Sequence, residues 1–342
     1  MKTSKPFLST LVWFYLICIF AATLLMYALG DRWWPATLLL FGPRWALGVP
    51  LVLLVPLAII RRRFLLLPLG LSVGIFLWPL LGWNMVLDSP AGAPGASIRV
   101  LSCNTRDGGI DRDALAALIT DQSVDIVSLQ ELPRWFALPI LQGWHIQRRA
   151  GVAIYSRYPL EPGKSVWAVH PPHLNKRLTG LSAVVDAPQG KFIFCAVHLP
   201  SPRYGLQNIV SRDMGVDTDK AGMLEDETRG RERASRQVAS LFESVSLPVV
   251  VAGDFNMPRQ SRIFRDVWGG FNDAFAETAS GYGWTFHDEY KGIPVPLSID
   301  HVVAGNGATP LNFAVGPDIY SDHRPIIADV ALFPPGYAAN QP

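Results

Sequence analysis

The sequence predicts a mixed α/β domain of packed layers that follows a group of membrane-spanning helices. Two observations lead to this prediction. Three long uncharged runs occupy most of the first 90 residues, and short strands with turns and a few helices follow from residue 97. The composition agrees, because 49% of the 342 residues are hydrophobic and only 17% are charged, against about 25% charged in an ordinary soluble domain.

The first part, residues 1–88, is predicted to be a membrane anchor with three transmembrane helices at about 8–29, 40–60 and 64–87. The first run has 22 uncharged residues and, at about 1.5 Å per residue, spans roughly 33 Å, enough to cross a bilayer core. Buried helices of a soluble protein are the alternative interpretation. We disfavour it because three such runs leave no polar face for water.

Basic residues between the runs predict the topology. Lys2, Lys5 and the triplet Arg61–Arg63 should be cytoplasmic by the positive-inside rule, which leaves the 31–44 loop outside. The tryptophans expected at the outer interface are Trp33, Trp34 and Trp83. The alternative is a cleaved signal peptide at residues 1–30, and the C-terminal part then still lies outside. Both interpretations place the second part on the extracytoplasmic side of the cytoplasmic (inner) membrane.

Charge and cysteine content exclude several classes of protein. Seven of the 30 basic residues and two of the 28 acidic residues precede residue 91. The second part therefore carries 23 basic and 26 acidic residues, a net charge of −3. The hydrophobic content excludes a disordered polar chain. Only three cysteines are present, which excludes a disulfide-dense scaffold, and we expect Cys18, Cys103 and Cys195 to be small buried apolar groups. The acidic sign argues against a broad DNA-binding surface.

The second part is predicted to extend from 97 to 332, after a linker rich in Pro, Gly and Ser at 89–96 and before a tail at 333–342. The predicted strands are 97–103, 125–129, 151–156, 181–186, 192–197, 248–252, 298–304 and 324–332. The predicted helices are 111–121, with Asp111 as its N-cap, and 231–244.

Chemically active side chains stand where these strands end or begin, so that loops could present them to one cleft. They are Asn104, Glu131, His198, Asp254, Asn256, Asp300, Asp322 and His323. Several of them, including Glu131, Asp322 and Asn104, offer only oxygen ligands, which suit Mg²⁺ or Mn²⁺ better than zinc. Histidines beside carboxylates can be held in one tautomer. A divalent cation, oriented histidines and a water-activating carboxylate together predict a phosphoester-hydrolysing site.

Five blocks of this sequence resemble the signatures of the endonuclease/exonuclease/phosphatase superfamily, in its order and at its spacing. They are QE at 130–131, GVAIYSRYPL at 151–160, GDFN at 253–256, SIDHVV at 298–303 and SDH at 321–323. The resemblance covers roughly residues 97–332. It implies a four-layer α-β-β-α sandwich of two mixed sheets, here preceded by an N-terminal transmembrane helical segment in a bacterial, membrane-anchored member.

The resemblance also implies a metal site for Mg²⁺ or Mn²⁺. Glu131 resembles the main metal ligand of the superfamily, and Asn104 and Asp322 resemble the residues that assist at the metal.

The resemblance implies catalytic roles for five further residues. Asp254 resembles the residue that orients and deprotonates the attacking water, and Asn256 the residue that positions water or phosphate. His323 resembles the histidine that contacts the phosphoryl oxygen, oriented by Asp300, and His198 a second histidine facing the phosphate.

Other residues attract attention but are expected to be structural. His301 follows Asp300 on a strand and should point to the opposite face. A role at the site is also less expected for His287, His170 and His173. The arginines at 229, 231, 233 and 236 alternate with acidic residues, so we expect a solvated helix rather than a phosphate clamp.

The substrate is left open by the sequence. The anchor favours a phosphoester at or near the lipid bilayer, either a phospholipid head group or nucleic acid, and no obligate protein partner is evident. The polar segment 201–230 is expected to be a mobile loop at the cleft rim. The alternative function is a non-catalytic binding or signalling module on the same fold, which predicts gaps among the catalytic positions, and none is found.

Overall fold

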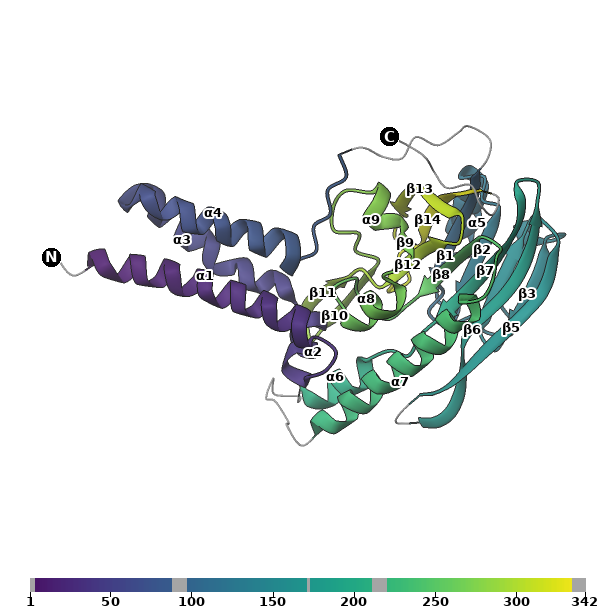
Figure 1. Ribbon diagram of the computed structural model, residues 1–342, viewed down its shortest axis with the longest axis horizontal. Helices are drawn as coiled ribbons and strands as arrows, with labels where there is room; N and C mark the ends of the chain where they lie inside the picture. Colours follow the sequence, from purple (N-terminus) through teal and green to yellow (C-terminus); the bar gives the residue numbers. More distant parts are fainter. Residues whose placement is uncertain (1–3, 88–96, 171–172, 211–219, 334–342) are drawn as a thin grey trace.

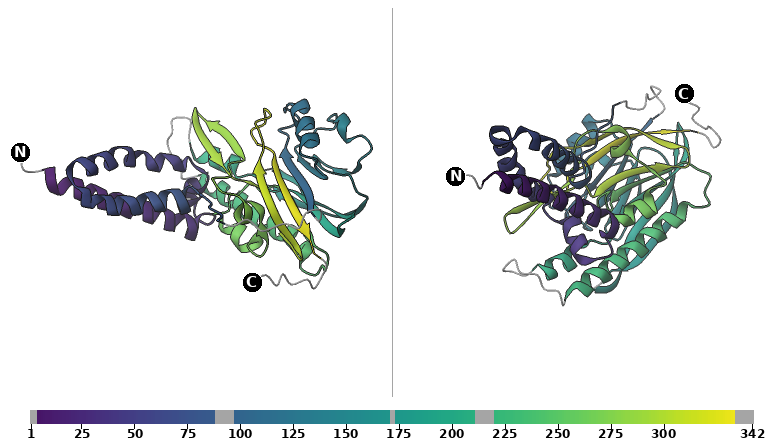
Figure 2. Two further views of the ribbon diagram at one scale, coloured as in Figure 1. Left: turned by 90° about the horizontal axis from the view of Figure 1, so that it is seen from above. Right: turned by 60° about the vertical axis from the view of Figure 1, so that its left-hand side comes forward.

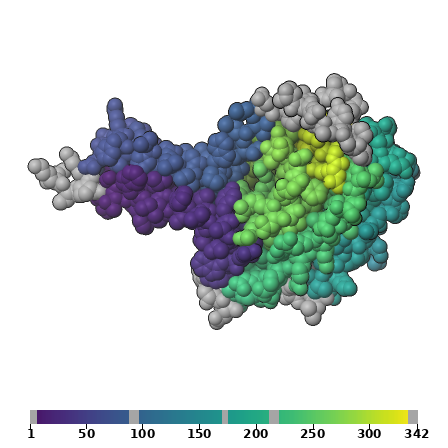
Figure 3. All heavy atoms as spheres, viewed as in Figure 1, coloured from purple at the N-terminus to yellow at the C-terminus, as the bar shows by residue number. Residues whose placement is uncertain are grey.

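The computed structural model describes residues 4–87, 97–170, 173–210 and 220–333, and it places a bundle of apolar helices beside a layered α/β domain (Figure 1). The anchor helices lie side by side at one end of the molecule (Figure 2). Their inner ends, next to the domain, pack against it without a gap (Figure 3). The predicted linker and all of the predicted tail except Phe333 lie outside the described residues.

Three helical segments are long and apolar enough to cross a membrane, by length and composition: Phe7–Leu29, Arg44–Arg61 and Arg63–Leu80. The helices that build the bundle and its loop are α1 (Ser4–Leu29), α2 (Trp34–Phe41), α3 (Val49–Arg61) and α4 (Leu66–Ile75). The short 3₁₀ segments are η1 (Arg44–Gly48) and η2 (Arg63–Leu65), and η3 (Phe76–Leu80) is a π-helical turn.

The second predicted transmembrane helix, 40–60, differs from the structure at its start. Helix α2 ends at Phe41, and the spanning segment begins only at Arg44. Gly42 is extended, with φ −85° and ψ 179°. The reason is Pro43, because a proline disfavours the helical conformation of the residue before it and has no N–H to donate.

The third predicted helix, 64–87, ends earlier, at Leu80. Gly82 follows with a φ of +86°, in the left-handed region that favours glycine. Asn84 pairs its backbone with Gly281 of the domain. Its side-chain amide donates to carbonyls at the end of α9 (Ala274–Thr278), those of Phe275, Ala276 and Ala279, at 3.1, 3.0 and 2.6 Å. Contacts with the domain therefore override the apolar pattern of these residues.

The domain contains two six-stranded mixed sheets, of order β13-β14-β1-β2-β4-β3 and β5-β6-β7-β8-β12-β9. The first has β1 (Ser97–Asn104), β2 (Ile126–Gln130), β3 (His145–Arg149), β4 (Val152–Ser156), β13 (Ala308–Val315) and β14 (Ile326–Leu332). The second has β5 (Leu160–His170), β6 (His173–Ala187), β7 (Gly190–His198), β8 (Val249–Asp254), β9 (Asn272–Asp273) and β12 (Asp300–Gly305). The pairs β1–β2 and β7–β8 are parallel and the other pairs antiparallel.

The sheets pack face to face through a buried apolar core to which Val100 and Ile126 contribute from one sheet and Phe192 and Val250 from the other. Helix α5 (Arg112–Asp121) covers the outer face of the first sheet. Helices α7 (Ala221–Ala239) and α8 (Arg262–Trp268) cover that of the second. The four-layer sandwich implied by the resemblance is therefore confirmed.

Two smaller helices and a hairpin complete the domain. Helix α6 (Arg203–Ile209) precedes α7, and short 3₁₀ turns lie at η4 (Pro139–Leu141) and η6 (Ser240–Phe242). Strands β10 (Phe286–Tyr290) and β11 (Ile293–Leu297) form a separate two-stranded hairpin. The N-cap prediction is confirmed, since the Asp111 side chain accepts from the N–H groups of Asp113 and Ala114.

The expectation of a mobile loop over 201–230 is wrong for the described part of that segment. Residues 203–209 form α6, and α7 begins at Ala221 rather than at 231. Buried contacts stabilise these helices, because the N–H of Gly205 donates to Glu227 at 2.8 Å. The edge strands β3 and β5 were not predicted from the sequence, because apolar and polar residues do not alternate clearly in these exposed strands.

Candidate active site

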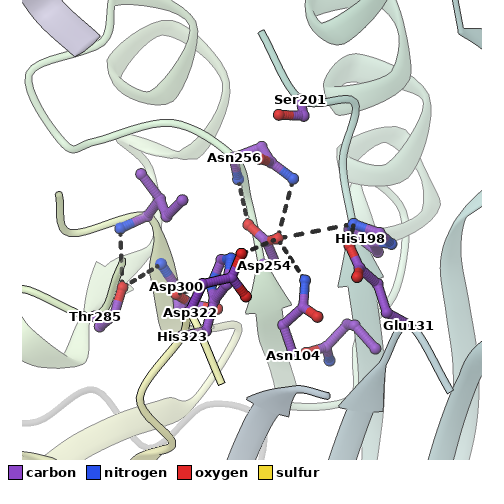
Figure 4. A network of polar contacts seen from close by, with 12 residues as sticks. Asn104, Glu131, His198, Ser201, Asp254, Asn256, Thr285, Asp300, Asp322 and His323 are labelled. Atoms are coloured by element: carbon purple, nitrogen blue, oxygen red, sulfur yellow. Dashed lines mark hydrogen bonds and ion pairs between the residues drawn. The ribbon is translucent and has the colours of Figure 1, made fainter. Parts of the chain in front are cut away.

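Both sheets bring their chemically active residues to one end of the sandwich (Figure 4). Asp254 ends β8, and the antiparallel strand β12 begins with Asp300 directly opposite it. His198 ends β7 beside Asp254, because these strands run parallel. The first sheet contributes the ends of β1 and β2 and the loop before β14, which supply Asn104, Glu131, Asp322 and His323. All eight predicted residues therefore lie around one centre.

Asp254 is the centre of this group and is 1% exposed. Its Oδ1 accepts from the backbone N–H of Asn256 at 2.8 Å. Its Oδ2 accepts from the amides of Asn104 at 3.1 Å and Asn256 at 3.0 Å. Burial raises the pKa of Asp254 to about 6, although His323 and His198 oppose the shift. The carboxylate is thus fixed by three donors and ionised at neutral pH.

His323 and Asp300 form a buried pair on one side of Asp254. The Nδ1 of His323 lies 2.8 Å from Oδ2 of Asp300, and its Nε2 lies 3.8 Å from Oδ2 of Asp254. Burial alone would lower the pKa of His323, but the two carboxylates outweigh it and raise the pKa to about 10. The ring of Phe286 packs edge-on against the imidazole, with centroids 5.1 Å apart. The pair therefore holds an oriented imidazolium.

His198 and Glu131 lie on the other side of Asp254. The Nε2 of His198 is 3.6 Å from Oε1 of Glu131 and 3.7 Å from Oδ2 of Asp254. Burial lowers the pKa of His198, so this imidazole is neutral where His323 is charged. Burial also raises the pKa of Glu131, and the nearby charges of Asp107 and Asp322 add to that shift. The Glu131 side chain nonetheless keeps 34% exposure and lies beside His198 (Figure 4).

Asp322 adjoins His323 and contacts the rim of the site. Its Oδ2 lies 3.9 Å from Nη1 of Arg203 on α6, and its backbone carbonyl accepts from the N–H of His287. The Arg203 guanidinium also donates to Asp288 of β10 at 3.0 Å. Helix α6 and the β10–β11 hairpin therefore meet at this edge of the site.

Three residues at the site have backbone conformations that are uncommon for their type or position. Glu131 and Asn256 have φ of +52° and +53°, a region that costs free energy for residues other than glycine. Gly253 has φ +153°, and a Cβ there would lie 2.0 Å from the carbonyl oxygen of Val197. The strand end that carries Asp254 consequently requires glycine before it.

A cation could be held by more than one set of these residues. Among the described residues, ligand atoms of Asp254, Asp300 and His323 lie within 4.8 Å of one another. In the structure the Asp254 oxygens accept three hydrogen bonds, and Nδ1 of His323 lies 2.8 Å from Oδ2 of Asp300. The crowded oxygens of Glu131 and Asp322 suit a hard cation that keeps several waters.

The sequence did not single out two residues that support the site. Thr285 is fully buried, and its hydroxyl accepts from the N–H groups of Ile299 and Asp300. Ser321 donates to the carbonyl of Asn104 at 2.9 Å and accepts from the N–H of His323 at 3.1 Å. The only available signal was that Ser321 stands in the SDH block. These hydroxyls connect loops that are far apart in the chain.

The residues that were expected to be structural lie away from the central carboxylate. His301 is 1% exposed and contacts Asp273 and the carbonyl of Met257, at 3.2 and 3.0 Å. His287 lies 3.5 Å from Asp318. His170 and His173 end β5 and begin β6.

The arginine prediction is wrong at one position. Arg229, Arg233 and Arg236 are exposed on α7, but Arg231 is fully buried. Its Nη2 lies 3.7 Å from Oδ1 of Asp31, and its guanidinium stacks 5.3 Å from the ring of Phe41. The anchor therefore covers the part of α7 that was expected to face water.

The Endonuclease/Exonuclease/phosphatase family matches residues 97–323, and the chain belongs to this family. The activities in the family's name all cleave phosphoester bonds, so the general chemistry of the chain is phosphoester hydrolysis. No curated protein matches the chain.

Solved structures are similar to the chain at low identity. An endonuclease/exonuclease/phosphatase from Beutenbergia cavernae DSM 12333 is 17% identical over 71% of this chain and 73% of its own, with a TM-score of 0.49. D. rerio TDP2 complexed with single strand DNA product is 16% identical over 69% of this chain and 99% of its own, with a TM-score of 0.49. The human Nocturnin catalytic domain with bound sulfate anion is 14% identical over 70% of this chain and 95% of its own, with a TM-score of 0.47.

Proposed function

We propose that the chain is a membrane-anchored, divalent-metal-dependent phosphoester hydrolase of the phosphodiesterase or nuclease type. The observation that carries this proposal is the buried carboxylate of Asp254, which three donors hold between a neutral and a charged imidazole. Such an arrangement can orient a water molecule and accept its proton next to a group that stabilises negative charge.

Glu131, with Asn104 and Asp322, would hold Mg²⁺ or Mn²⁺. When bound, the cation supplies Lewis acidity to a phosphoryl oxygen. Asp254 orients the attacking water and takes its proton, and its pKa of about 6 leaves it ionised at neutral pH. Asn256 fixes that carboxylate, because its amide donates to Asp254 and to the Leu199 carbonyl, at 3.0 and 2.8 Å.

The two histidines have different roles in this proposal. His323, charged and oriented by Asp300, faces a nonbridging phosphoryl oxygen, on which negative charge increases in the transition state. His198 is neutral and donates a hydrogen bond to the phosphate or to the leaving oxygen. No covalent intermediate is needed.

The proposed topology follows the basic residues. The N-terminus and Arg61–Arg63 are cytoplasmic, and the catalytic domain is extracytoplasmic. The three candidate spans support this topology, because an odd number of membrane crossings puts the domain on the side opposite the N-terminus. A reporter fused after residue 333 should be read outside the cytoplasm, and a cytoplasmic signal would contradict the topology.

The metal role can be tested on the full chain in detergent. With Mg²⁺ or Mn²⁺ it should hydrolyse a phosphodiester from a panel of DNA, RNA, phospholipids and bis(p-nitrophenyl) phosphate, and chelation should abolish turnover. Glu131→Gln should raise the metal concentration for half-maximal rate by at least about tenfold. Glu161→Gln, at an exposed glutamate of β5, is the control and should leave that concentration unchanged. Metal-independent turnover by the unmodified chain would overturn the mechanism.

A further inference from the structure

The anchor is fixed to the catalytic domain by a buried polar contact rather than tethered to it. Asp31, in the loop after α1, is 7% exposed. Its Oδ2 accepts from the hydroxyl of Ser261 at 2.7 Å and from the N–H groups of Arg262 and Ile263 at 2.6 and 3.2 Å. Asp31 thus caps the N-terminus of α8, and its Oδ1 faces the buried Arg231.

Apolar contacts extend the same interface. One buried cluster includes Met26 and Phe41 of the anchor together with Ala234 of α7 and Phe264 of α8. Arg265 of α8 donates to the carbonyl of Tyr27. Contacts of this kind lie on both α7 and α8, and the views show the anchor helices beside this side of the domain (Figures 1 and 2).

The β10–β11 hairpin connects the catalytic residues to the anchor. At one end, Phe286 pairs with His323. Toward the other end, the carbonyl of Pro294 accepts from the indole of Trp45, at 2.8 Å. Pro294 is paired with Glu289, three residues from Phe286. Three residues of a strand span about 10 Å, at about 3.4 Å per residue. Measured along the hairpin, His323 therefore lies about 10 Å from the point where Trp45 contacts Pro294.

Three tryptophans stand at or near the ends of the candidate spans. Trp33 follows the first candidate span, Trp45 lies at the start of the second, and Trp83 follows the third. Their exposed fractions are 46, 37 and 39%. Indole rings are favoured at the level of the lipid head groups. That layer is about 5–8 Å thick on each side of the hydrocarbon core. The site thus lies within a few ångströms of the head groups.

The edge of the site formed by α6 and the hairpin is also the edge nearest the anchor. Arg203 of α6 joins Asp288 of the hairpin to Asp322 of the site. Helix α6 is held to α7 by Glu227, and α7 is held to the anchor by Arg231. The hairpin thus contacts the anchor through Trp45, and α6 is joined to the anchor through α7.

We propose that the substrate is a phosphodiester in a lipid head group of the membrane that holds the chain. This inference rests on the proposed function and names its substrate class. Hydrolysis breaks one P–O bond of the head-group diester and forms one from the water oxygen. Asp254 takes the water proton, which then goes to the leaving alkoxide, so that a phosphate monoester and an alcohol result. The net charge of −3 on the domain agrees with a substrate other than a nucleic-acid backbone.

The test uses the full chain in vesicles of phosphatidylethanolamine, phosphatidylglycerol, cardiolipin and sphingomyelin, with Mg²⁺ or Mn²⁺. Loss of each lipid and appearance of its two products are measured beside hydrolysis of bis(p-nitrophenyl) phosphate and single-stranded DNA. Trp45→Phe removes the hydrogen bond to Pro294. It should slow lipid hydrolysis about two- to tenfold, the equivalent of one hydrogen bond, and leave the soluble diester unaffected. Trp13→Phe, on an exposed face of α1, is the control and should change neither rate.

The outcomes separate the two proposals. Hydrolysis of a lipid faster than of DNA and of the soluble diester supports the inference. Faster hydrolysis of DNA or of the soluble diester than of every lipid overturns the inference and leaves the proposed function standing. No metal-dependent hydrolysis of any substrate would overturn the proposed function and the inference with it.

Discussion

Asp254 and Asp300 show how two aspartates that face each other acquire different roles. They are direct partners across β8 and β12, and both are buried. Asp254 receives three hydrogen bonds from amide groups, whereas Oδ1 of Asp300 has no hydrogen-bond partner among the described residues. Asp300 instead directs its charge at His323. One aspartate is fixed by amide donors, and the other is paired with an imidazole.

The pH dependence of turnover should reflect these two groups. Asp254 must lose its proton to act, so kcat/KM should rise with pH through about 6. His323 must keep its proton, so kcat/KM should fall as pH increases through about 10. Asp300→Asn removes the charge that raises the His323 pKa, and it should move the alkaline limb down by at least about one unit. An alkaline limb that does not move in this variant would contradict the role of the pair.

At this scale the sequence predicted that these residues would lie together, because Asn104, His198 and Asp254 end strands whose pattern was clear. Their catalytic and metal-binding roles stay predictions. It could not predict Thr285, since a hydroxyl that accepts from backbone N–H groups has no distinctive spacing. It also failed at Arg231. The acidic neighbours on α7 indicated solvent, and nothing in the local sequence reveals that α2 covers this face.

At the scale of elements, α8 depends on a residue from outside the domain. Ser261 is its N-cap and accepts from the N–H of Phe264 at 3.3 Å. Asp31 accepts from the hydroxyl of Ser261 and adds a negative charge where the helix presents free N–H groups. The loop between Asn256 and Ser261 follows Asp254 directly, so this cap also holds the loop that carries the catalytic carboxylate.

Asp31→Ala should destabilise the folded chain by about 3–5 kcal/mol, because it removes the carboxylate that lies 3.7 Å from the buried guanidinium of Arg231. Adding Arg231→Met should restore part of that loss, since the unpaired charge is then removed. The thermal midpoint of the full chain in detergent measures both. Asp266→Ala, in an exposed pair with Arg262, is the matched control and should cost less than about 0.5 kcal/mol. Strictly additive effects of Asp31→Ala and Arg231→Met would show that the two charges do not interact.

Helix α5 could be predicted from its periodicity, because only one of its faces is buried. Strand β8 could be predicted from its continuous apolar run, because both of its faces are buried. The exposed strand β3 and the hairpin β10–β11 could not, since polar residues and prolines conceal the alternation. The ends of the anchor helices were missed at Gly42 and Leu80 for a different reason. Hydropathy records apolar composition, whereas a proline and the contacts of Asn84 determine where the helices end.

At the scale of the whole molecule, the anchor and the domain are one packed unit. The sequence divides them cleanly by composition, yet Asp31, Tyr27 and Asn84 of the first part bind α8 and α9 of the second. Long-range contacts of this kind leave no pattern within either part. The division by composition therefore does not correspond to a separation of the two parts in the structure.

A fragment that begins at residue 91 should be less stable than the full chain. It lacks Asp31 and exposes the apolar surface of α7 and α8 that the anchor covers. We expect a lower thermal midpoint than that of the full chain in the same detergent, and association in size-exclusion chromatography. A monodisperse fragment with the thermal midpoint of the full chain would contradict the view of a single packed unit.

The central claim is that Asp254 activates water for phosphoester hydrolysis, and a comparison of two buried aspartates tests it most directly. Asp254→Asn keeps the shape of the site but removes the base, and Asp273→Asn alters a buried aspartate bound to His301 away from the central carboxylate. The rate per folded molecule of the full chain, with Mg²⁺ and its best substrate, is the measurement. We predict a loss of about 10²–10⁴-fold for Asp254→Asn and an unchanged rate for Asp273→Asn. Full activity in Asp254→Asn would contradict the account.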